Sequence, residues 1–343
     1  IFVGGQSAAE GIRFLGEDGQ DVIRWMEKET GLVYGEHFYL IQKEQGKYQF
    51  AAGVKGVPVA PAGILEIELD GEGKLIFFTK YGYFPSSQEV RHEPFSLTLE
   101  QVEPIARQQL KRFHFPSQKR KRIIPVYALE EVFVSNDLST IFPADPLIET
   151  PSALSMDETL YWDKGLDQPF DRREMEPFEE VTPDQAFRGE ASPDVKPITP
   201  EEQRACREAV IRFLGQVYPQ ESGQWRLNAL YREQGYIFAV LRRNGDDPFI
   251  LKRKLTAIID PRQFEVLNYV DNGNFLEVFS RWPMSSAVTM TKEEAFAKLK
   301  EFLLLTPTYV YDRVHKRYRL CGKLDCTYAV QAATGEVLRL EDL

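Results

Sequence analysis

The amino-acid sequence predicts a soluble α+β protein built as two related halves. Three observations support this prediction: helix-start motifs recur, helical segments alternate with pairs of short strands, and matching features lie at nearly one offset. The chain has 343 residues, more than one ordinary core needs, and 43% of them are hydrophobic. No apolar run approaches the ~20 residues that span a bilayer, which predicts a soluble body.

Four segments show the spacing of amphipathic helices. The first, around residues 18–30, places Val22, Ile23 and Met26 on one side and ends at Gly31, a residue suited to a helix stop. The other three begin with a capping box, in which the Thr oxygen accepts the N3 amide and the Glu or Gln side chain reaches back to the cap amide. These boxes are Thr98–Gln101, Thr199–Glu202 and Thr291–Glu294.

Two prolines bear on where these predicted helices start. Pro200 occupies the first helical position of the second box, where its fixed φ is favourable. Pro104 lies about a turn into the first box and predicts a kink or a late start there. The second and third boxes are followed by apolar stripes at helical spacing: Cys206, Val210, Phe213, Leu214 and Val217, then Ala295, Phe296, Leu299, Phe302 and Leu303.

Three pairs of short segments read as β-hairpins. Leu65, Ile67 and Leu69 alternate with acidic residues, as in a half-buried strand. Turn-forming residues separate the two segments of each pair. The pairs are 64–69 with 74–80, 255–260 with 264–269, and 328–331 with 336–338.

The spacing of these features predicts an internal duplication. Thr98 and Thr291 are 193 positions apart (291 − 98), and Lys74 and Glu265 are 191 apart (265 − 74). We therefore expect a first half at 1–143 and a second half at 198–343, each with two helix-plus-sheet units. The predicted units span about 12–90, 97–143, 198–282 and 290–343.

The segment between the halves, 144–197, differs in composition. Nine of the 21 prolines lie in the segment from Pro143 to Pro200, both included. Residues 144–200 carry 14 acidic and five basic side chains, a net charge of −9 out of the chain's −10. Proline and charge repulsion predict an extended strap with little regular structure. Aromatic and apolar residues in it should anchor it to one or both halves: Tyr161, Trp162, Leu166, Phe170 and Phe178.

A basic run contains no acidic residue from 111 to 122. It ends in Lys119, Arg120, Lys121 and Arg122, which are the candidate binding residues. One interpretation is a site for an anion, a nucleic acid or an acidic surface. The other is a solvated helix end, where cations are favourable, docked by the acidic strap. The overall negative charge favours the second interpretation and predicts no nucleic-acid partner.

Three cysteines are too few for a disulfide scaffold. Cys206 lies on an apolar helix stripe and should be a buried thiol. Cys321 and Cys326 flank Gly322–Asp325, so a hairpin turn could bring them together as a disulfide. The alternative is two reduced cysteines in a strand.

The sequence contains no recognisable catalytic or cofactor-binding motif. Its four histidines (His37, His92, His114 and His315) have no Cys, Asp or Glu at metal-ligand spacing. His114, between Phe113 and Phe115, is interpreted as part of an amphipathic helix end. We therefore expect a protein that is not an enzyme and that binds no cofactor or metal.

Two stretches, Tyr48–Val59 and Ile64–Leu75, resemble the PepSY-type module, in which a Gly-Ile/Val-Pro-Val strand precedes a hydrophobic strand, an Asp-Gly turn and a returning strand. Ala333–Val337 is similar to the family's Thr-Gly-Glu-Val turn, although the family's aspartate is missing there. With its capped helices, the duplicated arrangement most resembles the YcdB/YcdC repeat proteins of Gram-positive spore formers. The resemblance implies an α+β fold of tandem PepSY-like units, each a helix packed on an antiparallel sheet, in two duplicated halves.

The resemblance also implies a class of function. PepSY-like modules occur in metalloprotease propeptides, where they chaperone and inhibit the enzyme, and in envelope proteins. We therefore expect an extracellular or cell-envelope binding or regulatory protein with a protein partner, a peptidase being one candidate. Any membrane association would come from a segment outside this chain. The alternatives are a structural or assembly protein of the envelope, and an enzyme with an unrecognised site.

Overall fold

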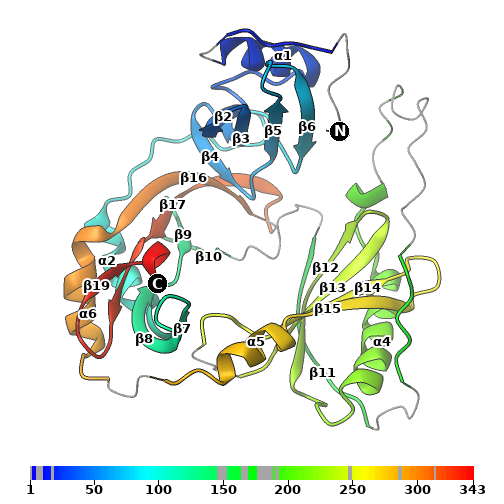
Figure 1. Cartoon of the computed structure of the whole chain (residues 1–343), viewed down its shortest axis with the longest axis vertical. Helices are drawn as coiled ribbons and strands as arrows, with labels where there is room; N and C mark the ends of the chain where they lie inside the picture. Colours follow the sequence, from blue (N-terminus) through cyan, green and yellow to red (C-terminus); the bar gives the residue numbers. More distant parts are fainter. Residues whose placement is uncertain are drawn as a thin grey trace. The chain divides into compact units, whose positions relative to one another are not determined.

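The structure, a computed structural model (Figure 1), describes residues 2–4, 11–16, 19–144, 153–163, 169–175, 188, 190, 193–245, 249–284, 288–312 and 314–343. The chain divides into two compact units, each assembled from segments distant in sequence. Unit 1 comprises Ile1–Gln109, Leu129–Pro151 and Phe302–Cys326, and unit 2 comprises Leu110–Ala128, Ser152–Glu301 and Thr327–Leu343. Mixed helices and sheets confirm the predicted α+β class.

Unit 1 contains the largest sheet. In the described residues its strands run in the order β1-β6-β5-β3-β4-β16-β17-β9-β10. Strand β2 lies outside this order and pairs with β3 on the edge opposite β5. The strands are β1 (Phe2–Gly4), β2 (Phe38–Glu44), β3 (Lys47–Val54), β4 (Val57–Ala60), β5 (Ile64–Leu69), β6 (Leu75–Tyr81), β9 (Val132–Ser135), β10 (Ile141–Pro143), β16 (Leu304–Asp312) and β17 (Arg317–Asp325). The helices are α1 (Gln20–Thr30) and α2 (Leu99–Gln109).

Local sequence signals explain much of unit 1. Val22 and Met26 of α1 are fully buried in the cluster that contains Leu65 and Ile67, as predicted from their spacing. Gly31 ends the helix with φ of 70°, and its N–H bonds the Glu27 carbonyl at 2.9 Å. The predicted hairpin of β5 and β6 is confirmed.

Helix α2 begins directly after Thr98, so the late start considered from Pro104 is not observed. Gln101 donates its backbone N–H to the Thr98 hydroxyl at 3.4 Å, and its side-chain oxygen accepts the Thr98 N–H at 2.9 Å. The capping box therefore forms although Pro104 lies inside the helix.

Unit 2 contains two sheets, ordered β11-β12-β13-β14-β15 and β19-β18-β8-β7 in the described residues. The strands are β7 (Leu110–Ser117), β8 (Arg122–Leu129), β11 (Leu154–Leu160), β12 (Trp225–Glu233), β13 (Tyr236–Arg243), β14 (Lys254–Ile259), β15 (Val266–Asp271), β18 (Tyr328–Gln331) and β19 (Val337–Arg339). The helices are α4 (Pro200–Val217), α5 (Gly273–Ser280) and α6 (Lys292–Leu299).

Helix α4 covers one face of the five-stranded sheet (Figure 1). Cys206, Val210 and Phe213 pack on the same core as Trp225 and Leu241, all 2% exposed or less. Complete capping boxes at Thr199 and Thr291 begin α4 and α6, as predicted. The predicted hairpins of β14 with β15 and of β18 with β19 are also confirmed.

The strap is more structured than expected. Residues 154–160 form β11, which pairs antiparallel with β12 and is an edge strand of the five-stranded sheet. Leu154, Met156 and Leu160 contact the core of unit 2, so apolar residues at alternate positions favour a strand despite the acidic composition. Trp162 and Phe170 anchor to this core as predicted, Tyr161 is 69% exposed, and Leu166 and Phe178 lie outside the described residues.

The expected helix end at the basic run is wrong. Helix α2 stops at Gln109, and residues 110–117 form β7. Phe113 and Phe115 both pack against the apolar cluster of β8 and β18, because a two-residue spacing puts both side chains on one face of a strand. Pro116 has no amide proton for a helix hydrogen bond. His114 therefore lies in a strand.

Two stretches of the chain have the same order of elements, and the hairpins of each stretch pair with hairpins of the other. One runs α2-β7-β8-β9-β10, and the other runs α6-β16-β17-β18-β19. In unit 1, β16 and β17 join β9 and β10, whereas in unit 2, β7 and β8 join β18 and β19. Each sheet thus combines the first hairpin of one stretch with the second hairpin of the other. This pairing joins the segments 97–143 and 290–343, and the duplicated PepSY-like arrangement stays a prediction.

The proposed Cys321–Cys326 disulfide is wrong. Strand β17 runs through Arg317–Asp325 without the expected turn, so Cys321 lies within the strand and Cys326 directly follows it. Both are free and buried, as is Cys206. Burial raises the pKa of the Cys206 and Cys321 thiols to about 12.

Candidate binding site

Unit 2 contains a pocket of about 620 Å³, within the range of small-molecule sites. Its lining comes from the end of α4, the residue before β14, the last residues of β15, the start of α5 and the strap. These residues are Arg172, Val217, Tyr218, Arg253, Tyr269, Val270, Asp271, Asn274 and Glu277. The pocket is partly open to solvent and combines apolar, aromatic and charged groups.

Asp271 joins the polar groups on one side of the pocket, here called the polar wall: Tyr218, Arg253 and the Gly273 N–H. Its Oδ2 accepts hydrogen bonds from the Tyr218 hydroxyl and, at 2.8 Å, from Arg253 Nη2. Its Oδ1 accepts the backbone N–H of Gly273 at 2.8 Å. The side chains of Asp271 and Arg253 are 16% and 25% exposed, so this ion pair is largely removed from water.

Local sequence explains how these groups meet. Tyr218 directly follows α4, and its N–H bonds the Leu214 carbonyl, which fixes the ring at the helix end. A β-carbon at Gly273 would lie 1.6 Å from Arg253 Nη1, so only glycine lets the guanidinium rest against the start of α5.

The strap supplies the second arginine. Phe170 packs against Phe213 and Tyr269 with ring centroids 4.9 and 5.6 Å apart. The Arg172 guanidinium lies 4.0 Å from the centre of the Tyr269 ring. The neighbouring Arg173 donates its backbone N–H to the Leu267 carbonyl at 2.9 Å, which holds this part of the strap along β15.

Three groups of the lining keep free hydrogen-bonding capacity within the described part of the chain. Arg172 makes no ion pair there, and Arg253 Nε is buried without an acceptor. The Glu277 carboxylate likewise has no described partner. A buried unsatisfied donor costs about 1–3 kcal/mol, so a shift of the Arg253 side chain that brings Nε–H to an acceptor would be favourable.

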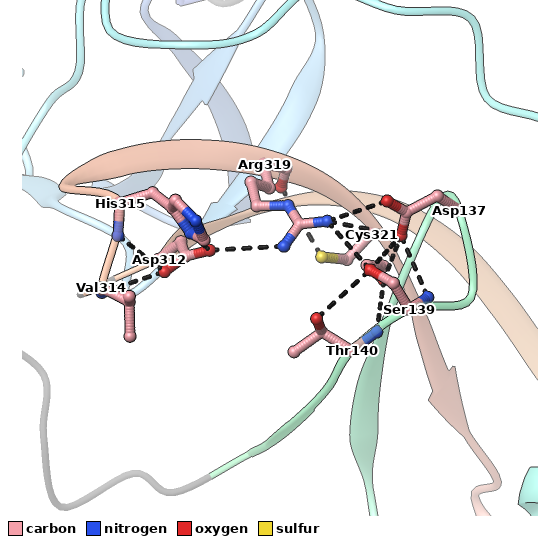
Figure 2. A network of polar contacts seen from close by, with 9 residues as sticks. Asp137, Ser139, Thr140, Asp312, Val314, His315, Arg319 and Cys321 are labelled. Atoms are coloured by element: carbon pink, nitrogen blue, oxygen red, sulfur yellow. Dashed lines mark hydrogen bonds and ion pairs between the residues drawn. The ribbon is translucent and has the colours of Figure 1, made fainter.

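A second polar cluster lies in unit 1, where Arg319 joins the turns of two hairpins (Figure 2). Arg319 contacts Asp312 through Nη1 at 3.4 Å and Asp137 through Nη2 at 3.1 Å. His315 Nδ1 lies 2.7 Å from Asp312 Oδ2, and Ser139 donates its hydroxyl to Asp137. The chain segments involved are the β16–β17 turn and the β9–β10 turn, so the cluster ties exchanged hairpins together.

The candidate binding residues from the sequence lie at the β7–β8 turn and not in the pocket. Arg120 bonds Gln331 at 3.2 Å and lies 3.7 Å from Glu336. Lys121 lies 5.4 Å from the Trp282 ring centre and bonds Gln118. Lys119 and Arg122 are exposed. Two of the four cations thus have partners inside unit 2.

The sequence analysis missed the pocket residues. Asp271, Asn272 and Gly273 follow a predicted strand and carry a turn signal, but nothing in the sequence pairs them with Tyr218 or Arg253. Arg172 lies two positions after the predicted anchor Phe170 and was the strongest available clue.

The described residues contain no cluster of three or more His, Cys, Asp and Glu placed to hold a metal ion. No described helix combines the length and hydrophobicity needed to cross a membrane. Comparison of the chain with protein-family models, with curated proteins and with solved structures found no match in any of the three.

Proposed function

We propose that this chain is a non-catalytic binding protein that acts in the cell envelope or outside the cell, and that the pocket of unit 2 is its binding site. The observation that carries this proposal is the state of the polar groups in the pocket. Asp271 already has three donors, whereas Arg172 and Arg253 Nε keep free donors among the described residues.

At the Asp271–Tyr218 pair this arrangement favours recognition over proton transfer. Glu277 is the lining carboxylate without a described partner, and no described acid or nucleophile is hydrogen-bonded to it. A general base needs a carboxylate or phenolate free to accept the substrate's proton. The Asp271 carboxylate is held by Tyr218, Arg253 and Gly273. Burial and the hydrogen bond to Asp271 raise the pKa of Tyr218 well above its ordinary value, so the phenol stays protonated at neutral pH.

The resemblance to PepSY-like modules supports the location and the partner class. Such modules restrain or chaperone peptidases, so a secreted or envelope peptidase is the first partner to test. In this proposal the partner presents a polar group to the pocket.

A pull-down from the envelope and secreted fractions of the source organism tests the proposal. The baits are the intact chain, the R172Q variant and the matched R173Q variant. Arg173 is the neighbouring exposed arginine, paired with Glu265 at 3.0 Å and absent from the pocket. We expect one enriched partner that wild type and R173Q retain and that R172Q loses.

Equal capture by all three baits, or no capture, would overturn the pocket as the binding site. A captured peptidase should lose activity, or refold faster, when the chain is added. Unchanged activity and refolding would refute the restraining or chaperoning role. Self-association without another partner would favour the assembly alternative.

A further inference from the structure

We infer that the pocket of unit 2 binds the carboxylate of an amino acid or short peptide, with Glu277 facing the ligand's ammonium group. The inference rests on the proposed function, in which this pocket is the binding site, and it names the ligand class. It follows from the charges that remain unpaired in the pocket.

The carboxylate end is assigned to the two arginines. A guanidinium presents a planar fork of donors that matches a carboxylate. Arg172 stacks on Tyr269 at 4.0 Å, and stacking leaves the edge of its guanidinium open for hydrogen bonds. Arg253 is fixed by Asp271 and retains a buried Nε–H without an acceptor in the described chain.

The charge balance distinguishes a carboxylate from a phosphate. The lining carries two arginines and two carboxylates, Asp271 and Glu277, so it has no excess positive charge. A dianionic phosphate would face both acids, and only the arginines would offset it. A zwitterion can place its negative end at the arginines and its positive end at Glu277.

The remaining lining suits the rest of such a ligand. Val217 and Val270 provide apolar surface, and Val270 is 66% exposed. Asn274 offers an amide donor and an acceptor for a peptide bond. This combination of few polar groups with apolar walls is typical of small-molecule sites.

Calorimetric titration of the full chain with four defined probes tests the inference. The probes are the tripeptide Gly-Gly-Val, its C-terminal amide, its N-acetyl form and inorganic phosphate. We expect saturable binding of the free tripeptide with a Kd on the order of 0.1–1 mM, as for a few charge-assisted contacts. The amide and the acetylated peptide should each bind at least about tenfold more weakly, since each removes one charged contact.

Variants assign the contacts. R172Q should weaken tripeptide binding about tenfold, whereas R173Q should leave it unchanged. E277Q should abolish the preference for the free over the acetylated peptide. Trp225, whose ring lies 5.3 Å from Tyr218, provides a fluorescence signal that reports binding next to this wall.

Several outcomes would overturn the inference. They are equal binding of the acid and the amide, equal binding by R172Q, tighter binding of phosphate, or no saturation up to about 10 mM. Equal binding of the acetylated peptide would overturn the assignment of Glu277. If peptides fail but R172Q still loses a protein partner, the proposed function stands and this inference falls. If peptides bind through Arg172 but the protein partner ignores R172Q, the pocket is not the site for the protein partner, whereas the peptide site stands.

Discussion

Asp271 of unit 2 and Asp312 of unit 1 occupy closely similar polar environments. Each carboxylate accepts hydrogen bonds from an arginine, from one further side chain and from at least one backbone N–H. Their side chains are 16% and 5% exposed. Asp271 lines a pocket, whereas Asp312 supports the turn of a hairpin (Figure 2).

The two arginines show why one cluster is a binding site and the other a clamp. Arg319 uses both terminal nitrogens on protein acceptors, Asp312, Asp137 and Ser139. Arg253 retains an unpaired Nε–H, and the nearby Arg172 has no acidic partner in the described chain. Unused hydrogen-bonding capacity beside a cavity, and not the number of charged residues, indicates recognition.

Replacing Asp312 with alanine should have the largest effect on stability. The substitution removes a nearly buried partner of Arg319, so we expect the free energy of unfolding to fall by about 3 kcal/mol. Chemical denaturation measures it. E72A is the control, because Glu72 is 65% exposed in its ion pair with Lys74 and should change stability by less than about 0.5 kcal/mol.

The rate of thiol labelling shows which unit the D312A substitution destabilises. Cys321 lies in β17 of unit 1, and Cys206 lies in α4 of unit 2. D312A should speed labelling of Cys321 by roughly tenfold or more and leave Cys206 nearly unchanged. Equal acceleration at both thiols would show that Asp312 does not act as a local clamp.

Replacing Tyr218 with phenylalanine should have an intermediate effect in unit 2. It removes one donor to Asp271 and keeps the ring, so we expect a loss of about 1.5 kcal/mol in the free energy of unfolding. The matched control is Y161F, since Tyr161 is 69% exposed. Identical denaturation midpoints for the two variants would contradict the role of the Tyr218 hydroxyl.

The smallest expected effect is a change in the pH dependence of stability. It reports on the charge of the Asp312 carboxylate alone. Burial alone would raise its pKa, but hydrogen bonds from His315 and Arg319 outweigh burial and hold the pKa below its ordinary value. A lowered folded-state pKa stabilises the protein above the unfolded pKa, and this contribution is lost as pH falls. Unfolding free energies measured from about pH 5 to pH 2 should therefore decline less steeply for D312N than for wild type. Parallel declines would refute this account.

Several features of the fold were predictable from short stretches of sequence. The Thr199 and Thr291 capping boxes, the stop at Gly31 and the hairpin turns depend on residues only a few positions apart. The basic run shows where such reasoning failed. Charge suggested a helix end, but the spacing of Phe113 and Phe115 favours a strand once a core exists to receive both rings.

The sequence by itself determined the α+β class, most helix starts and three of the hairpins, because capping, periodicity and turn geometry act between near neighbours. Only the tertiary structure decided which hairpins pair, since similar hairpins offer similar backbone edges and long-range packing selects among them. It also decided the pocket, where Arg172, Tyr218 and Asp271 come from separate segments and meet on the core of unit 2. A carboxylate next to an arginine can hold two chain segments together or can line a binding site. The hydrogen bonds that remain unmade after folding distinguish the two cases.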